Sequence, residues 1–202
     1  MIVYVETNFI LELAYRQERA ESCDEILKMA AAREITLALP AFSAAEARVT
    51  WQRRVFEREN FHEQLRKQIR EVSRSEYFRK LDEQSKDVVA AFAAGTEDSL
   101  ARLEATIEAV QTHGTIVALT GEIVSSARLH GAVLSLSPQD ALVLASVRAH
   151  AEQHSGEKCF VSQDVKGFAN PTVRDELGAA GCKVLVNFAD AVRYIRHAGR
   201  SD

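Results

Sequence analysis

Short apolar, β-rich runs alternate with helix-like segments at both ends of this 202-residue chain. Residues 2–5, 35–39, 159–162 and 184–186 are expected strands, and residues 116–119 fit either a strand or the entry to a helix. Parallel strands need long crossover connections, which are usually helical. Such alternation is typical of a parallel sheet covered by helices, so the sequence predicts the α/β class.

The middle of the chain has a different pattern. Residues 41–94 contain neither Gly nor Pro. Apolar residues recur there at helical spacing, which predicts two long helices that turn near residues 73–75. We expect Gly95 and Thr96 to break the pattern and a further helix to end at Gly114. The other expected helices begin near Phe9, or span residues 20–32, 122–129, 138–151, 175–179 and 188–195.

Composition and charge narrow the functional classes. A hydrophobic content of 47% and a charged content of 27% are those of an ordinary globular protein. The net charge of −4 predicts no overall attraction to nucleic acid. Three cysteines without metal-ligand spacing argue against a disulfide framework. The first residues do not look like a signal peptide, and no apolar run is long enough for a membrane span. We therefore expect a cytoplasmic protein that does not enter a membrane.

Four acidic residues stand where predicted strands end or predicted helices begin. They are Glu6, Glu46, Asp140 and Asp164. The carboxyl ends of parallel strands share one edge of a sheet, and ligands bind in the crevice there. Four carboxylates at that edge repel one another unless a cation or protons neutralise them. The pattern suits a hard divalent cation such as Mg²⁺ or Mn²⁺.

Each acid also has a purely structural interpretation. Ser43 and Glu46 have the spacing of a capping box, and Ser137, Pro138 and Asp140 repeat the arrangement. Glu6 would be stabilised by a helix dipole, and Asp164 would be a turn residue. A capping acid already lies at a helix N-terminus, so both roles can coincide. Four acids at four independent junctions favour a shared site.

The order of these motifs resembles the PIN domain, a family of metal-dependent nucleases that includes VapC-type ribonuclease toxins. The matching segments are Ile2–Leu11, Glu46, Asp140-Ala141-Leu142 and Ser162-Gln163-Asp164, within residues 1–50 and 116–190. The resemblance implies a three-layer α/β/α fold for a single domain over residues 1–202. Residues 51–114 have no counterpart in compact members and are expected to be a helical insertion between the second and third acids.

The resemblance also implies chemistry. Glu6, Glu46, Asp140 and Asp164 would hold Mg²⁺ or Mn²⁺ and catalyse phosphodiester hydrolysis in RNA, and Asn8 and Ser162 would orient them. The family ordinarily has Asp at the position of Glu6. It often has a further acid just after the fourth one, whereas this chain has Lys166 near that position. A catalytically weak or inactive PIN-like module that binds RNA or protein is therefore the alternative. Two further functions stay possible, a nuclease that cuts DNA and a different α/β enzyme that acts on phosphate esters.

Substrate attraction must come from elsewhere, because the expected site is acidic. Residues 48–80 contain ten Arg or Lys against five Glu. We expect Arg48, Arg53, Arg54 and Lys166 to contact nucleic acid, and Trp51 and Phe56 to stack on bases. The structural alternative is a solvated helix with Glu–Arg pairs at i, i+4. The same helices could bind an antitoxin-like inhibitor, and residues 81–110 could form a homodimer face or pack on the core.

Overall fold

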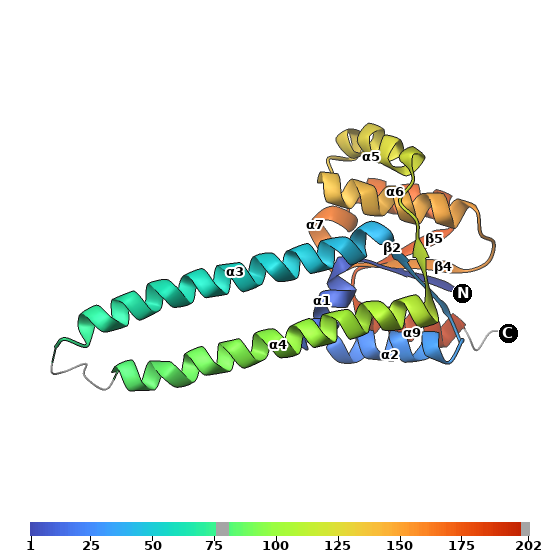
Figure 1. Ribbon diagram of the computed structural model, residues 1–202. Helices are drawn as coiled ribbons and strands as arrows, with labels where there is room; N and C mark the ends of the chain where they lie inside the picture. Colours follow the sequence, from blue (N-terminus) through green and yellow to red (C-terminus); the bar gives the residue numbers. More distant parts are fainter. Residues whose placement is uncertain (76–80, 199–202) are drawn as a thin grey trace.

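Five parallel strands form one sheet in the order β3-β2-β1-β4-β5 (Figure 1). The structure, a computed structural model, describes residues 1–75 and 81–198. The strands are β1 (Ile2–Val5), β2 (Thr36–Pro40), β3 (Gly114–Val117), β4 (Lys158–Val161) and β5 (Cys182–Leu185). The register aligns Val3 with Leu37 on one side and with Cys159 on the other. The predicted α/β class is confirmed, and the uncertain segment at residues 116–119 is in part strand β3.

Helices cover both faces of the sheet, which makes the fold three-layered. One face packs on α1 (Thr7–Tyr15), α2 (Ala20–Ala31) and α9 (Phe188–Ala198). The other packs on α6 (Pro138–Glu152) and α8 (Pro171–Ala179), with α5 (Gly121–Leu134) outside α6. Strand side chains alternate between faces: Val3 and Val5 lie in the first core, and Tyr4 lies in the second.

Two long helices project from the sheet as a hairpin, which we call the arm (Figure 1). They are α3 (Ala41–Val72) and α4 (Leu81–His113). Leu103 and Val110 of α4 are fully buried in the first core, so this end of the predicted 81–110 face packs on the sheet layer. The Trp51 indole donates a hydrogen bond to the Ser99 hydroxyl at 3.0 Å and joins the two helices. Arg79 and Lys80, counted in the basic segment, lie outside the described residues.

Three expectations about helix ends are wrong. Helix α3 begins at Ala41, directly after β2, so Ser43 lies inside its first turn and caps nothing. Helix α1 begins at Thr7, two residues before the expected start at Phe9, and Glu6 is its N-cap. Helix α4 runs through Gly95, which is exposed and has nothing within 4 Å of a would-be Cβ. A glycine inside a helix costs only about 1 kcal/mol, so one glycine does not end a helix of this length.

Cys23, Cys159 and Cys182 are buried free thiols, which confirms the absence of a disulfide framework. Within the part of the chain that the structure describes, no helix is both long and apolar enough to cross a membrane. A short helix, α7 (Val165–Phe168), was not expected, and it follows β4 at the edge where the acids lie.

Alanine substitution should have opposite effects on the free energy of unfolding at Gly95, inside α4, and at Gly114, the first residue of β3. At Gly95 a methyl group meets nothing, so Gly95→Ala should raise the free energy of unfolding by about 1 kcal/mol. At Gly114 it would lie 2.7 Å from the Leu37 carbonyl oxygen and 2.9 Å from that of Val110. Gly114→Ala should therefore lower the free energy of unfolding by about 1–3 kcal/mol. Guanidinium denaturation measures both, and a shift of the same sign in both variants would contradict this packing.

Candidate active site

The four predicted acids gather at the carboxyl edge of the sheet. Glu6 directly follows β1, and Asp164 follows β4. Glu46 lies in the second turn of α3, which continues β2, and Asp140 lies in the first turn of α6. Because β2, β1 and β4 are neighbours in the sheet, three acids emerge from adjacent strands. Coulombic repulsion acts between three pairs of these acids, which are Glu6 and Glu46, Glu46 and Asp140, and Asp140 and Asp164.

Glu6 is buried, with 5% of its surface exposed, and both carboxylate oxygens are engaged. One accepts a hydrogen bond from the Asn8 backbone N–H at 2.8 Å, which caps α1. The other accepts from the Ser162 hydroxyl at 3.0 Å. Burial raises the pKa of Glu6 to about 7, although these hydrogen bonds lower it, and Glu46 adds a smaller repulsion. The predicted orienting residues Asn8 and Ser162 thus both contact Glu6, and Asn8 lowers the pKa of Glu6 through its backbone N–H and, to a smaller extent, through its side chain.

Ser162 connects Glu6 to the fourth acid. Its buried hydroxyl oxygen accepts a hydrogen bond from the Asp164 backbone N–H at 3.0 Å. The Asp164 carboxylate in turn accepts from the backbone N–H groups of Lys166 and Gly167, at 2.9 and 3.1 Å. Asp164 is therefore the N-cap of α7 as well as a member of the acidic group.

Hydroxyl groups orient the two remaining acids. The Thr7 hydroxyl donates a hydrogen bond to the Glu46 carboxylate. The Ser137 hydroxyl donates to Asp140 at 2.6 Å and accepts from the Asp140 backbone N–H at 3.1 Å, which confirms the cap predicted there. Burial raises the pKa of Glu46, and repulsion from Asp140 adds to the shift. Burial also raises the pKa of Asp140, with repulsion from Asp164 as a further cause.

This donor set fits a hard divalent cation in its chemistry. Four carboxylates lie together, and those of Glu6, Glu46 and Asp140 have pKa values raised by burial and mutual repulsion. A Cβ added at Gly167 would lie 2.8 Å from an Asp164 oxygen and 3.2 Å from an Asp140 oxygen, so those two carboxylates flank one point. Among the described side chains of residues 1–75 and 95–198, however, no three His, Cys, Asp or Glu side chains form a ready-made ligand group.

Comparison with known families agrees with this geometry. A family model described as PIN domain matches residues 3–168, which is most of the chain. The chain belongs to the PIN domain family. No match was found among curated proteins. PIN domains are generally nucleases, and the five-stranded parallel sheet between two helical layers is consistent with this nuclease-like fold.

The basic residues predicted to contact nucleic acid lie in different surroundings in this PIN domain. Arg48 forms an ion pair with Glu104 of α4. Arg53 lies 4.0 Å from Glu57 and also counteracts the raised pKa of Glu46, which places it near the acids. Arg54 packs over the Tyr15 ring. Lys166 is exposed beside Asp164.

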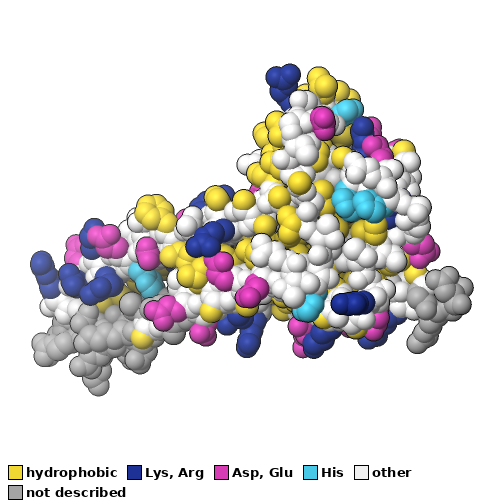
Figure 2. Space-filling model, turned by 45° about the vertical axis from the view of Figure 1, so that its right-hand side comes forward, with side chains coloured by type: hydrophobic (Ala, Val, Ile, Leu, Met, Phe, Trp, Pro, Cys, Tyr) yellow, Lys and Arg dark blue, Asp and Glu magenta, His cyan; other side chains and the backbone are white. Residues whose placement is uncertain are grey.

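The arm carries both signs of charge on its surface. Figure 2 shows Lys and Arg side chains along it with acidic ones between them. Glu63 and Lys67 form the kind of i, i+4 pair that the structural alternative predicted, at 2.8 Å. Trp51 is partly buried against the core and α4, so it is not free to stack on a base. Phe56 is 63% exposed and fits that role.

Thr7 and Gly167 also belong to the acidic edge, and no pattern in the sequence predicted their roles there. Thr7 holds Glu46 across 39 positions of sequence, and only the sheet order brings the two together. Gly167 gives the Asp140 and Asp164 carboxylates room, because a Cβ there would overlap both. The one signal in the sequence was the glycine three positions after Asp164.

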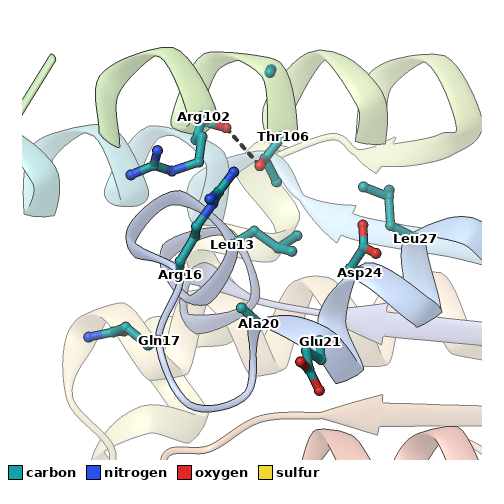
Figure 3. Close-up of a pocket in the computed structure, with 10 residues that line it drawn as sticks. Leu13, Arg16, Gln17, Ala20, Glu21, Asp24, Leu27, Arg102 and Thr106 are labelled. Atoms are coloured by element: carbon teal, nitrogen blue, oxygen red, sulfur yellow. Dashed lines mark hydrogen bonds between the residues drawn. The ribbon is translucent and has the colours of Figure 1, made fainter. Parts of the chain in front are cut away.

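A separate pocket lies between the end of α1, α2 and α4 (Figure 3). It has a volume of about 640 Å³. Arg16 and Arg102 contribute positive charge, and Glu21 and Asp24 contribute negative charge. None of the four site acids lines it, so it is distinct from the acidic edge.

The buried carboxyl of Glu6 predicts a pH-dependent stability in the metal-free protein. With a pKa of about 7 when folded and an ordinary value of 4.5 when unfolded, the folded state holds the extra proton between those values. The free energy of unfolding should therefore fall as pH rises from 4.5 to 7, by up to about 3 kcal/mol from this group. In Glu6→Gln this contribution is absent, so the variant should lose less stability over that range.

Urea denaturation in EDTA at several pH values measures the difference. The exposed Glu34→Gln serves as the control and should follow the wild type. The raised pKa values of Glu46 and Asp140 act in the same direction, so the Glu6→Gln profile should keep a reduced slope. Parallel profiles for wild type and Glu6→Gln would show that Glu6 is ionised at no cost in the fold.

Proposed function

We propose that this PIN domain is a Mg²⁺- or Mn²⁺-dependent endoribonuclease. The observation that carries the proposal is the set of four acids at one sheet edge, with burial and repulsion raising the pKa of three of them. Such a group is expensive to assemble without a cation to neutralise it. Family membership supports nuclease chemistry at that edge.

Glu6, Glu46, Asp140 and Asp164 would hold the cation or cations. When bound, the metal would lower the pKa of a water nucleophile and stabilise the leaving oxygen. The chain itself orients the ligands: Thr7 holds Glu46, Ser137 holds Asp140, and Ser162 joins Glu6 to the Asp164 backbone. The backbone N–H groups at the start of α7 keep one Asp164 oxygen fixed, and the other oxygen faces Gly167.

The alternative function is a weak or inactive PIN-like module that binds RNA or a protein. The hydrogen bonding of Glu6 is the observation that favours it, since both oxygens already accept hydrogen bonds from the protein. A carboxylate so engaged has fewer lone pairs for a metal.

The remaining features belong to the same proposal. We propose that residues 1–202 form one domain, with residues 51–114 as an insertion that includes most of the arm. Arg48, Arg53, Arg54 and Lys166 would contact RNA. We also propose a cytoplasmic location, which the buried free cysteines fit. Further parts of the proposal are a VapC-like toxin role with an antitoxin-like inhibitor, and homodimer formation.

Asp140→Asn should abolish metal-dependent cleavage. The substitution removes one negative charge but keeps the shape and the cap of α6, so the rate should fall by at least about 100-fold. Cleavage of a mixed RNA pool with Mg²⁺ or Mn²⁺ titrated in measures it, and Asp175→Asn, at an exposed position of α8, is the control. Loss of activity in both variants, or in neither, would sink the assignment of the acidic edge as the active site.

Glu6→Asp tests the alternative. The shorter side chain releases the carboxylate from the geometry in which it caps α1 and meets Ser162. If Glu6 makes this a degenerate site, the variant should cleave the RNA pool faster than the wild type. If Glu6 is an adapted ligand, cleavage should slow, and wild-type activity then rules out the binding-only function. Replacing the ribose of the substrate with 2′-deoxyribose separates RNA from DNA specificity.

A further inference from the structure

Two arginines of the arm are held over one aromatic ring. Arg54 and Arg58 are one helical turn apart on α3, and their guanidinium carbons lie 5.1 and 5.2 Å from the centre of the Tyr15 ring. Tyr15 is the last residue of α1. All three side chains are partly buried. Stacking on an aromatic face orients a guanidinium and leaves its N–H donors available at the edge of the plane.

Among the side chains that the structure describes, these two arginines have no acidic partner, whereas comparable arginines do. Four arginines within residues 1–75 and 81–198 are partly buried. Arg148 pairs with Glu152 and Glu176, and Arg102 lies 3.8 Å from Asp98 and donates to a backbone carbonyl oxygen. Arg54 and Arg58, the other two, form no ion pair with a carboxylate among the described side chains of residues 1–75 and 95–198. Two cations held beside one ring repel each other unless an anion lies between them.

The pair has a fixed position relative to the acidic edge. Helices α1 and α3 lie side by side, with Thr7 bonded to Glu46 at one end and Tyr15 against Arg54 at the other. Arg54 is eight residues beyond Glu46, which corresponds to about 12 Å along the helix. A strand of nucleic acid that reaches the acids can therefore also pass the arginine pair.

We propose that Arg54 and Arg58, supported by Tyr15, bind a non-scissile phosphate of the RNA substrate. This inference rests on the proposed ribonuclease function and adds a subsite to it, with Arg58 and Tyr15 as new members. Paired guanidinium groups bind phosphate oxygens through two parallel hydrogen bonds. An RNA strand is a better occupant than an acidic peptide, because the acidic edge on the same helix repels a peptide carboxylate, whereas a phosphodiester belongs there with its cation.

The test compares RNA affinity and cleavage in full-length variants. Binding of a fluorescent mixed-sequence RNA is measured by anisotropy in an Asp140→Asn background, so that the RNA stays intact. Arg54→Gln and Arg58→Gln should each weaken binding about tenfold and lower the slope of log affinity against log salt by about 1. Arg66→Gln is the matched control, an exposed arginine of the same helix. It should change affinity by less than about twofold.

Two further readouts separate a binding role from a structural one. With Asp140 intact, the Arg54 and Arg58 variants should raise KM and leave kcat unchanged, because the phosphate is not the one cleaved. Arg58→Lys keeps the charge and loses the planar fork, so it should restore the salt slope but not the full affinity. The effect should also vanish with RNA too short to reach from the acids to the arginine pair.

The outcomes are distinguishable. Unchanged affinity and KM in both glutamine variants, with thermal stability at the wild-type level, would overturn the subsite. So would polyglutamate binding that the variants lose while RNA binding persists, since the pair would then serve an acidic protein partner. If the wild type neither binds nor cleaves RNA, the proposed function itself fails, and the subsite fails with it.

Discussion

Strand β1 lies between β2 and β4, and its parallel pairing with both fixes where three of the four acids emerge. The register aligns Val5 at the end of β1 with Val161 at the end of β4. Glu6 directly follows β1, Ser162 directly follows β4, and Asp164 lies two residues after Ser162. Helix α3 continues β2 without a loop, and its second turn carries Glu46 to Thr7. A one-residue slip of β1 would turn Glu6 toward the other face of the sheet. The acidic edge depends on that register.

Assembling the acids opposes folding, and the surrounding polar groups reduce that cost. Burial is the largest cause of the raised pKa of Glu6, and hydrogen bonds from Asn8 and Ser162 offset part of that effect. Hydroxyl donors from Thr7 and Ser137 do the same for Glu46 and Asp140. The hydrophobic cores on both sides of the sheet supply the stability that this arrangement consumes. Buried and mutually repelling charges gathered at one edge are typical of a site kept for function at the expense of stability.

The sequence predicted the fold better than it predicted the contacts within the site. Alternating apolar runs and helical periods are local, so the strands, most helices and the cap at Ser137 could be found from neighbouring residues alone. The contact between Thr7 and Glu46 depends on the pairing of β1 with β2, which no local pattern contains. Ser43 and Glu46 have the spacing of a cap, but β2 runs directly into α3, and the helix begins three residues too early for Ser43 to cap it.

Glu6 combines two demands that an aspartate would meet differently. Its extra methylene group lets the carboxylate turn back to the Asn8 N–H while the second oxygen reaches Ser162 across to the end of β4. The acid therefore ties β1, α1 and β4 together at the site, and Ser162 passes that link on to Asp164. A cation would compete with these donors for the same oxygens and would also relieve the penalty of burying the charge. Because a metal stabilises only the ionised form, metal binding and proton release at Glu6 are coupled. The balance between the cation and the two hydrogen bonds decides whether this edge of the PIN domain is a nuclease site or a rigid structural junction.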